Sequence, residues 1–234
     1  MSLLLPRRRP SAERLDDPSL PAEEMRRSLE DLSLVNRRWG GSRALARALL
    51  QRLDGERGRA VRILDVGGGS GDVARRLESL LRAAGRDAAV VAVDVQWRHL
   101  AAGRAMTGGS RLRAAAADAF RLPFADRSVD LAVSTLFFHH FSPEENASIL
   151  RELSRVARLG FAVLDLRRAW VPMGFVALAG RAVFRARVSV EDGVASVRQA
   201  YTPREAESIA RRVTPDAAAR RVFPYRFLLE GGRA

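Results

Sequence analysis

The sequence predicts an α/β fold with a doubly wound, mostly parallel sheet. Short apolar segments alternate with helical segments between about residues 61 and 166, which is the pattern of strands joined by crossover helices. The segment Ala89–Val93 is apolar at every position, as expected for a strand covered by helices on both faces. A chain of 234 residues with 47% hydrophobic content is long enough to bury one full core.

The N-terminal region has two parts. Residues 1–22 are rich in Pro, Arg, Ser and Asp and predict a mobile tail. Residues 23–58 predict a helical cap, because Met25, Leu29 and Leu32 recur at helical spacing and Ser42 is suited to cap a second helix. We therefore expect the core at residues 59–234.

The core elements follow from periodicity and from capping residues. We expect strands at residues 61–66, 88–93, 112–116, 129–134 and 161–166, with helices at 72–84, 96–106 and 143–159. Ser142 and Thr202 are the expected N-caps of helices that begin with proline, and Glu205 would complete a capping box. The second of these helices extends to about residue 213, and residues 220–229 predict a closing strand.

Residues 169–200 predict an insertion in the core. The apolar stretch 169–184 is interrupted by Pro172, Gly174 and Gly180 and is shorter than the roughly 20 residues that cross a bilayer. We expect no membrane span and a cytoplasmic protein, since Leu3–Leu5 is too short for a signal-peptide core. The insertion is expected to form a helical lid over an apolar acceptor, or a dimer contact.

Composition excludes several kinds of chemistry. Cysteine and lysine are both absent, which excludes disulfides, thiolate sites and Schiff bases. Only three histidines occur and two are adjacent, so no metal site is expected. The net charge of +13 suits nucleic acid or an anionic surface, or reflects a GC-rich genome. The arginines are spread along the chain, which favours the genomic explanation, and we expect no nucleic-acid partner.

A glycine-rich turn carries the main functional signal. The strand ending at Val66 leads into Gly67, Gly69 and Gly71 and then into a helix, a geometry that exposes backbone N–H groups to an anion. Alone, the turn fits a dinucleotide or another adenosine cofactor. The loop is shorter than the dinucleotide fingerprint. Asp94 ends the next strand, where its carboxylate can accept hydrogen bonds from both hydroxyls of a ribose.

Five segments, in order, resemble the motifs of class I methyltransferases that use S-adenosylmethionine (SAM). These segments are 63–72, 90–94, 117–124, 126–141 and 150–160. The resemblance covers about residues 61–166 and implies a Rossmann-like, seven-stranded sheet, SAM as the cofactor and S-adenosylhomocysteine (SAH) as the product. The chain departs from the family at Arg158-Leu159-Gly160, where a Pro-Gly pair is usual.

The resemblance also implies a cofactor site. The glycines of the loop would hold the methionine part of SAM, and Asp65 would hold the loop or face the cofactor's amine. Asp94 would bind the ribose, and Asp118 would lie at the edge of the adenine. The full expected set is Arg43, Asp65, Gly67, Gly68, Gly69, Gly71, Asp94, Val95, Gln96, Asp118, Ala119 and Ser134. For each there is an ordinary structural alternative, such as a tight turn, a helix cap or a surface arginine.

The catalytic and acceptor residues are expected near the end of the fourth strand. His139 and His140 are candidate general bases, because histidine titrates near neutral pH; alternatively they pack against the cofactor or cap the next helix. The candidate acceptor-binding residues are Trp39, Phe137, Arg168, Arg198 and Tyr201, which would otherwise be core or surface residues.

A narrower resemblance points to the acceptor. Residues 36–41, 165–168 and 192–202 resemble bacterial small-molecule methyltransferases encoded beside polyketide synthases. This implies O-methylation of a phenol or carboxylate in secondary metabolism, by a monomer or homodimer. The alternatives are C-methylation of a quinone-like ring, an RNA methyltransferase, a binding module that has lost transfer, and a nicotinamide enzyme.

Overall fold

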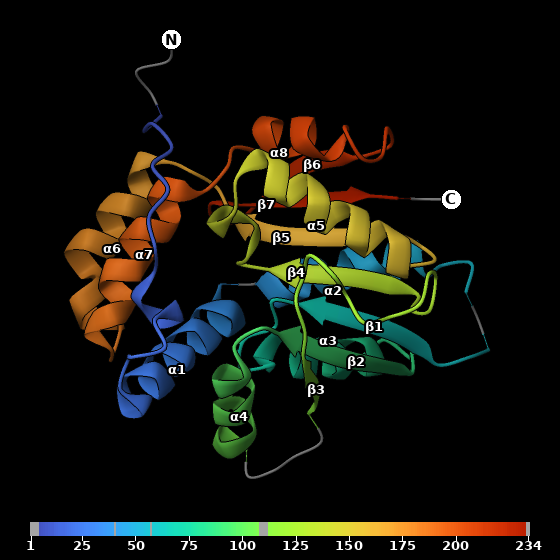
Figure 1. Ribbon diagram of the computed structural model, residues 1–234, viewed down its shortest axis with the longest axis horizontal. Coiled ribbons are helices and arrows are strands. Elements are labelled where there is room, and N and C mark those ends of the chain that lie inside the picture. Colours follow the sequence, from blue (N-terminus) through green and yellow to red (C-terminus); the bar gives the residue numbers. More distant parts are fainter. Residues whose placement is uncertain (1–4, 40, 57, 108–111, 233–234) are drawn as a thin grey trace.

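A seven-stranded sheet forms the centre of the molecule (Figure 1). The computed structural model describes residues 5–39, 41–56, 58–107 and 112–232, so residues 1–4 of the expected tail and Gly40 lie outside the described residues. The strand order is β3-β2-β1-β4-β5-β7-β6. The strands are β1 (Val61–Val66), β2 (Ala88–Asp94), β3 (Arg113–Ala116), β4 (Leu131–Thr135), β5 (Phe161–Leu166), β6 (Ala218–Val222) and β7 (Arg226–Gly231).

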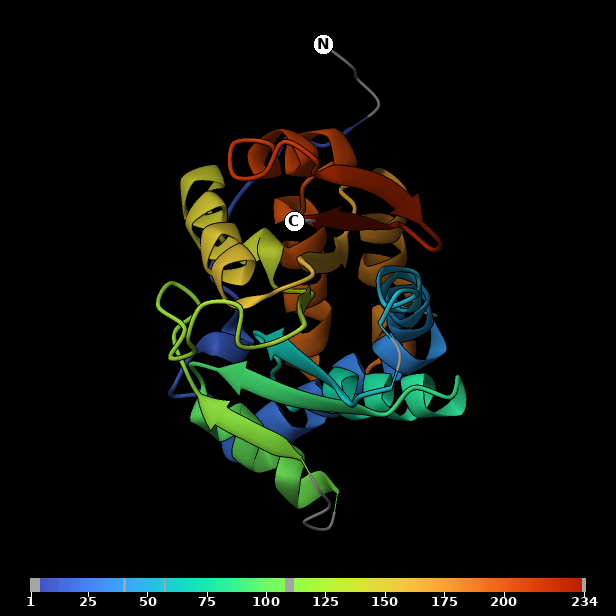
Figure 2. The same cartoon turned by 90° about the vertical axis from the view of Figure 1, so that its right-hand side faces the viewer.

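The sheet is doubly wound, as the sequence predicts. Strands β1 to β5 pair in parallel, and β7 runs antiparallel to both β5 and β6. Helices cover both faces (Figure 2). One face packs against α2 (Gly41–Arg52), α3 (Asp72–Ala83) and α4 (Trp97–Met106), and the other against α5 (Pro143–Val156) and α8 (Pro203–Ala210).

Alternation along the strands explains this two-sided core. Ile63 of β1 joins the cluster with α2 and α3, whereas its neighbour Leu64 joins the cluster with α5 and α8. Both side chains are 0–1% exposed. A strand that is buried on both faces must be apolar at consecutive positions, which is why β1, β2 and β5 were recognisable in the sequence.

The predicted helix caps are present. The hydroxyl oxygen of Ser142 accepts a hydrogen bond from the Glu145 amide at 3.2 Å, and that of Thr202 accepts one from the Glu205 amide at 3.2 Å. In each case the glutamate carboxylate accepts a hydrogen bond from the amide of the capping residue, so both capping boxes are complete.

The C-terminal region differs from the prediction. Residues 220–229 were expected to form one strand, but they form parts of β6 and β7, which pair antiparallel around Phe223–Tyr225. Pro224 has no backbone N–H for a ladder, and Tyr225 has φ of +49°, so the strand cannot continue through this segment. The second half of the predicted insertion forms helix α7 (Arg187–Gln199).

Three helices lie beside the carboxyl ends of the parallel strands. These are α1 (Ala22–Arg38), α6 (Trp170–Val183) and α7, which stand together at the left of Figure 1. Carboxyl ends of parallel strands are where open α/β sheets bind ligands. No helix in the described ranges is both long and apolar enough to span a membrane.

The N-terminal segment is held against the core, in contrast to the mobile tail that its composition predicts. It includes a short 3₁₀ helix, η1 (Arg14–Asp16). The Arg8 guanidinium donates to the carbonyls of Gln199 at 2.7 Å and Phe141 at 2.9 Å. The amides of Arg14 and Leu15 both donate to the Asp192 carboxylate at 2.9 Å. Composition misses this order because the partners are distant in sequence. We call residues 6–20 the N-terminal strap.

Candidate cofactor and active site

A cavity of about 1080 Å³ lies between the carboxyl ends of the strands and the α1, α6 and α7 helices. The glycine loop and the N-terminal strap both contribute to its lining. Most of its large side chains are apolar, among them Leu29, Leu32, Val35, Trp39, Phe137, Phe141, Val171, Phe175, Val176 and Val197. A cavity of this size and lining suits an organic ligand together with a small acceptor.

The glycine loop needs its glycines for two different reasons. Gly67 has φ of +69°, and a Cβ there would collide with the ring of Phe137. Gly69 has φ of +52°, and a Cβ there would meet no atom of the described chain within 4 Å. Gly67 is therefore required by packing, whereas Gly69 leaves space beside the cavity for a ligand to approach the backbone.

Asp94, at the end of β2, is fixed by the same loop. Its Oδ2 accepts a hydrogen bond from the Gly69 amide at 2.8 Å, and its Oδ1 accepts one from the Gln96 amide at 2.8 Å. Each oxygen keeps a free lone pair, and Asp94 lines the cavity. A carboxylate held in this way is suited to accept the two hydroxyls of a ribose.

Asp65 is a buried carboxyl without a partner. It is 1% exposed, and neither of its oxygens is hydrogen-bonded within the described chain. Burial, with the nearby charges of Asp72 and Asp94, raises its pKa to about 8. A cation in the cavity would favour its ionised form. SAM carries a sulfonium, an ammonium and a ribose, so Asp65, Asp94 and the open side of Gly69 together fit this cofactor.

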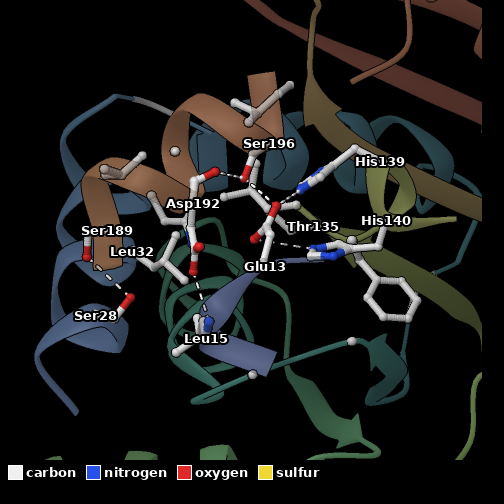
Figure 3. A pocket seen from close by; sticks show the side chains of 18 of the residues that line it. Glu13, Leu15, Ser28, Leu32, Thr135, His139, His140, Ser189, Asp192 and Ser196 are labelled. Carbon is white, nitrogen blue, oxygen red and sulfur yellow. Dashed lines mark hydrogen bonds and ion pairs between the residues drawn. The ribbon is translucent and has the colours of Figure 1, made fainter. Parts of the chain in front are cut away.

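His139 lies between the carboxylates of Asp165 and Glu13, and Figure 3 shows the contact with Glu13. Its Nδ1 lies 2.7 Å from Asp165 Oδ1, and its Nε2 lies 3.3 Å from Glu13 Oε1. Burial lowers the pKa of His139, but the charges and hydrogen bonds of Asp165 and Glu13 outweigh burial and raise it to about 10. His139 is therefore an imidazolium at neutral pH and has no free site for another proton.

His140 is in a different electrostatic environment although the two rings stack, with centroids 4.3 Å apart. Burial and the charge of His139 lower its pKa. Its Nδ1 is 3.5 Å from Asp16, its Nε2 is 3.8 Å from Glu13, and it lines the cavity. Of the two predicted candidates, His140 is the one that is neutral and able to accept a proton.

Glu13, His139 and His140 form a cluster of side chains that could each ligate a metal ion. Atoms of Glu13, His139 and His140 lie within 4.8 Å of one another, a spacing that a metal ion could bridge. The charge on His139 already accounts for this closeness: despite burial, hydrogen bonding to His139 helps lower the pKa of Glu13 to about 2. Glu13 also accepts hydrogen bonds from Ser196 at 2.5 Å and Gln199 at 2.8 Å.

The cavity gathers much of the predicted cofactor set but not all of it. Of the predicted set, the lining residues are Asp65, Gly67, Gly68, Gly69, Asp94, Val95 and Gln96. Arg43 is exposed on α2 and does not line the cavity, because its helix packs its other face on the sheet. Asp118 is exposed, and its Oδ1 accepts a hydrogen bond from the Phe120 amide at 2.9 Å.

Other predicted cofactor residues have structural environments. A Cβ on Gly71 would lie 2.5 Å from Leu112, so this glycine allows α3 to approach its neighbour. Ala119 and Ser134 are buried but do not line the cavity. At the end of β4 the adjacent Thr135 lines it instead.

The predicted acceptor residues divide in the same way. Trp39 and Phe137 line the cavity, and Trp39 packs edge-on against Phe175 with centroids 5.9 Å apart. Tyr201 is buried and donates to the Phe141 carbonyl at 2.7 Å. Arg168 and Arg198 do not line the cavity.

Arg168 has a full set of structural partners. It is 5% exposed, and its guanidinium donates to the carbonyls of Pro6 at 2.8 Å and Ala200 at 2.6 Å and to the Glu205 carboxylate at 2.7 Å. The sequence suggested an acceptor ligand because it could not show these contacts. Arg168 instead joins the N-terminal strap to β5 and α8.

Sequence reasoning missed several charged side chains that line the cavity, among them Glu13, Asp16, Asp192 and Arg226. Glu13 and Asp16 belong to the N-terminal strap, Asp192 to α7, and Arg226 to β7. Asp192 lies in a segment already noted for its resemblance to small-molecule enzymes. An arginine within the apolar run of β7 was an available signal for Arg226.

Comparisons with known proteins identify the family of the chain. The family described as "Methyltransferase domain" matches residues 63–160. The chain is 34% identical over 185 residues to the ubiquinone/menaquinone biosynthesis C-methyltransferase UbiE of Methylobacterium nodulans, covering 77% of this chain and 71% of that protein. It is 31% identical over 117 residues to UbiE of Laribacter hongkongensis, covering 48% of this chain but only 46% of that protein.

Solved structures support the fold. A SAM-dependent methyltransferase from Aquifex aeolicus has a TM-score of 0.54 at 20% identity, covering 80% of this chain and 88% of that chain. The plantazolicin methyltransferase BamL, solved with SAH, has a TM-score of 0.59 at 14% identity, covering 85% and 77%. The CurJ carbon methyltransferase has a TM-score of 0.60 at 8% identity, covering 82% and 54%. By its sequence relatives and its fold, the chain belongs to the class I SAM-dependent methyltransferases and is an enzyme that uses SAM.

Proposed function

We propose that this enzyme methylates an oxygen atom of a small, mostly apolar phenol or carboxylic acid in secondary metabolism. The observation that carries the proposal is the single cavity that joins the glycine loop to the neutral imidazole of His140 through apolar walls. A largely apolar cavity favours a small molecule over RNA, for which stacking aromatics and a basic face would be expected.

His140 would accept the proton of a phenol acceptor. When bound, SAM supplies an electrophilic methyl group on its sulfonium. His140, neutral at physiological pH, would then hold the hydroxyl and take up its proton, while the charged His139 stays fixed by Asp165 and Glu13. A carboxylate acceptor would need only orientation and the exclusion of water.

The test is turnover by the purified enzyme with SAM and a panel of phenols and aromatic acids, with products identified by mass spectrometry. For a phenol substrate, His140→Gln should lower kcat by about 10²-fold or more and leave SAH affinity unchanged. The proposal would be contradicted if no compound of the panel gave a methylated product. It would also be contradicted, for a phenol reaction assisted by His140, if the His140→Gln variant kept the wild-type kcat.

C-methylation of a quinone-like ring is the second candidate. It is favoured by the similarity to two proteins named as UbiE C-methyltransferases. A carbon acceptor also loses a proton from the reacting ring, so the same histidine would serve. Proton NMR of the product separates the two, because a methyl ether or ester resonates well downfield of a methyl group on a ring carbon.

We also propose that residues 169–200 act as a lid over the acceptor. Helix α6 contributes Val171, Phe175 and Val176 to the cavity. Helix α7 contributes Asp192, whose carboxylate accepts a hydrogen bond from the Arg14 amide of the N-terminal strap. A polyketide acceptor, a cytoplasmic location and a monomeric or homodimeric state remain predictions from the sequence.

A further inference from the structure

Arg226 is a buried arginine at an unusual place. It begins β7, is 1% exposed, and is the only arginine among the described residues that line the cavity. The described lining includes carboxyl side chains at Asp65, Asp72 and Asp94. Burying a guanidinium is costly unless it is paired and hydrogen-bonded.

The guanidinium has few partners. Its Nη2 donates one long hydrogen bond, 3.4 Å, to Asn36 Oδ1. Its Nη1 is buried and has no hydrogen-bond partner among the described residues. Burial lowers its pKa to about 10, and the charges of Asp165 and Asp72 oppose this shift. Arg226 is therefore still a cation at neutral pH, with donors free to bind an anion.

The surroundings keep space for Nη1. A Cβ on Gly41 would collide with this nitrogen, so only glycine at the start of α2 permits the observed side-chain position. Asn36 also donates to Asp72 at 3.4 Å, which connects Arg226 to the first residue of α3. The guanidinium is thus held beside the helix that follows the glycine loop.

Asp65 and Arg226 are buried groups of opposite type, and each has a side-chain atom without a hydrogen-bond partner among the described residues. Asp65 has two buried oxygens without partners, and Arg226 has a buried nitrogen without one; both line the same cavity. Asn36 links Arg226 to Asp72 by hydrogen bonds, and Asp72 lines the cavity together with Asp65. A carboxyl group that a bound cation would ionise and a guanidinium with an unpartnered nitrogen together match the ammonium and the carboxylate of an α-amino acid.

We propose that Arg226 binds the carboxylate of the cofactor's amino-acid end, with Asp65 facing its ammonium group. Arg226 comes from strand β7, whereas Arg43, the arginine of the expected cofactor set, is exposed and lies outside the cavity. An acceptor carboxylate is the other source of the same chemistry, and the experiment below separates the two.

The experiment compares two ligands by calorimetry. SAH carries the amino-acid group, whereas 5′-methylthioadenosine has the same adenosine and thioether but lacks that group. Arg226→Gln should weaken SAH binding by about 10- to 100-fold and change methylthioadenosine binding by less than about 2-fold.

The matched control is Arg52→Gln. Arg52 is also a buried arginine, with its side chain 4% exposed, but it pairs with Glu230 and lies outside the cavity. This variant should change the two affinities equally. If Arg226→Gln does not fold, Arg226→Lys provides the same comparison, and its loss of SAH affinity should exceed its loss of methylthioadenosine affinity by at least about 3-fold.

Three results would overturn the proposal. Unchanged SAH affinity would show that Arg226 does not hold the cofactor. Equal loss for both ligands would make it a structural residue. Unchanged SAH affinity with loss of 1-naphthoate binding to the SAH-loaded protein would assign Arg226 to the acceptor carboxylate instead.

Discussion

The charge of His139 should make folding stability fall with pH in a defined window. The pKa of this imidazole is raised from 6.5 in the unfolded chain to about 10 in the folded protein. The folded protein therefore holds one more proton than the unfolded chain between these values. The stabilisation is complete below pH 6.5 and is lost as pH rises through 10. Within that range, one such group lowers the free energy of unfolding by about 1.4 kcal/mol per pH unit.

The window from pH 8.0 to 9.5 isolates this effect. The chain has no lysine and no cysteine, so few other side chains titrate there. The raised pKa of Asp65, about 8, also makes stability fall as pH rises, but most of that fall occurs below pH 8. From pH 8.0 to 9.5 the wild-type protein should therefore lose about 2 kcal/mol of unfolding free energy on account of His139.

The assay is urea unfolding followed by tryptophan fluorescence, at several pH values, for the wild type and His139→Gln. Glutamine keeps hydrogen-bonding atoms near Asp165 but does not titrate. The variant should be less stable at pH 8.0, and its unfolding free energy should be nearly flat across the window. Equal slopes in the two proteins would refute the assignment of a charged His139 between Asp165 and Glu13.

Three further substitutions test other parts of the structure. Gly71→Ala should cost about 2–3 kcal/mol in urea unfolding, because φ is +68° and a Cβ would lie 2.5 Å from Leu112; a neutral result would contradict the packing described. Arg168→Met should cost about 3 kcal/mol in unfolding and leave SAH affinity unchanged, whereas an effect on acceptor binding alone would restore its predicted role. Phe175→Ala should reduce acceptor turnover several-fold without weakening SAH binding, and Leu178→Ala, on the same helix but 89% exposed and outside the cavity, should not; equal effects would exclude a lid role for this face.

The fold was largely predictable because its signals are local. Strand β1 was bounded correctly, since an apolar run that ends in glycines has few other interpretations. The capping boxes at Ser142 and Thr202 were also readable, because all their atoms come from four consecutive residues. The turn at Phe223–Tyr225 was missed, because the apolar and arginine residues on either side of it read as one strand.

The site was predictable only where a motif carries it. Gly69 and Asp94 lie 25 residues apart, yet each ends or follows a strand in the expected order, so their meeting could be foreseen. Glu13 and Arg226 reach the cavity from the two ends of the chain, and their contacts depend on tertiary packing. Among 40 arginines, the sequence could not show that Arg226 is buried at the cavity while Arg43 faces solvent.

The most direct test of the cofactor site is calorimetric titration with SAH of the wild type, Asp94→Ala and Asp54→Ala. Asp94 lines the cavity, whereas Asp54 is exposed and outside it. The account predicts tight binding by the wild type and by Asp54→Ala, with a loss of about 10- to 100-fold or more in Asp94→Ala, because two charge-assisted hydrogen bonds to the ribose are removed. Wild-type protein that does not bind SAH, or an Asp94→Ala variant that binds as tightly as the wild type, would contradict the assignment of this cavity to SAM.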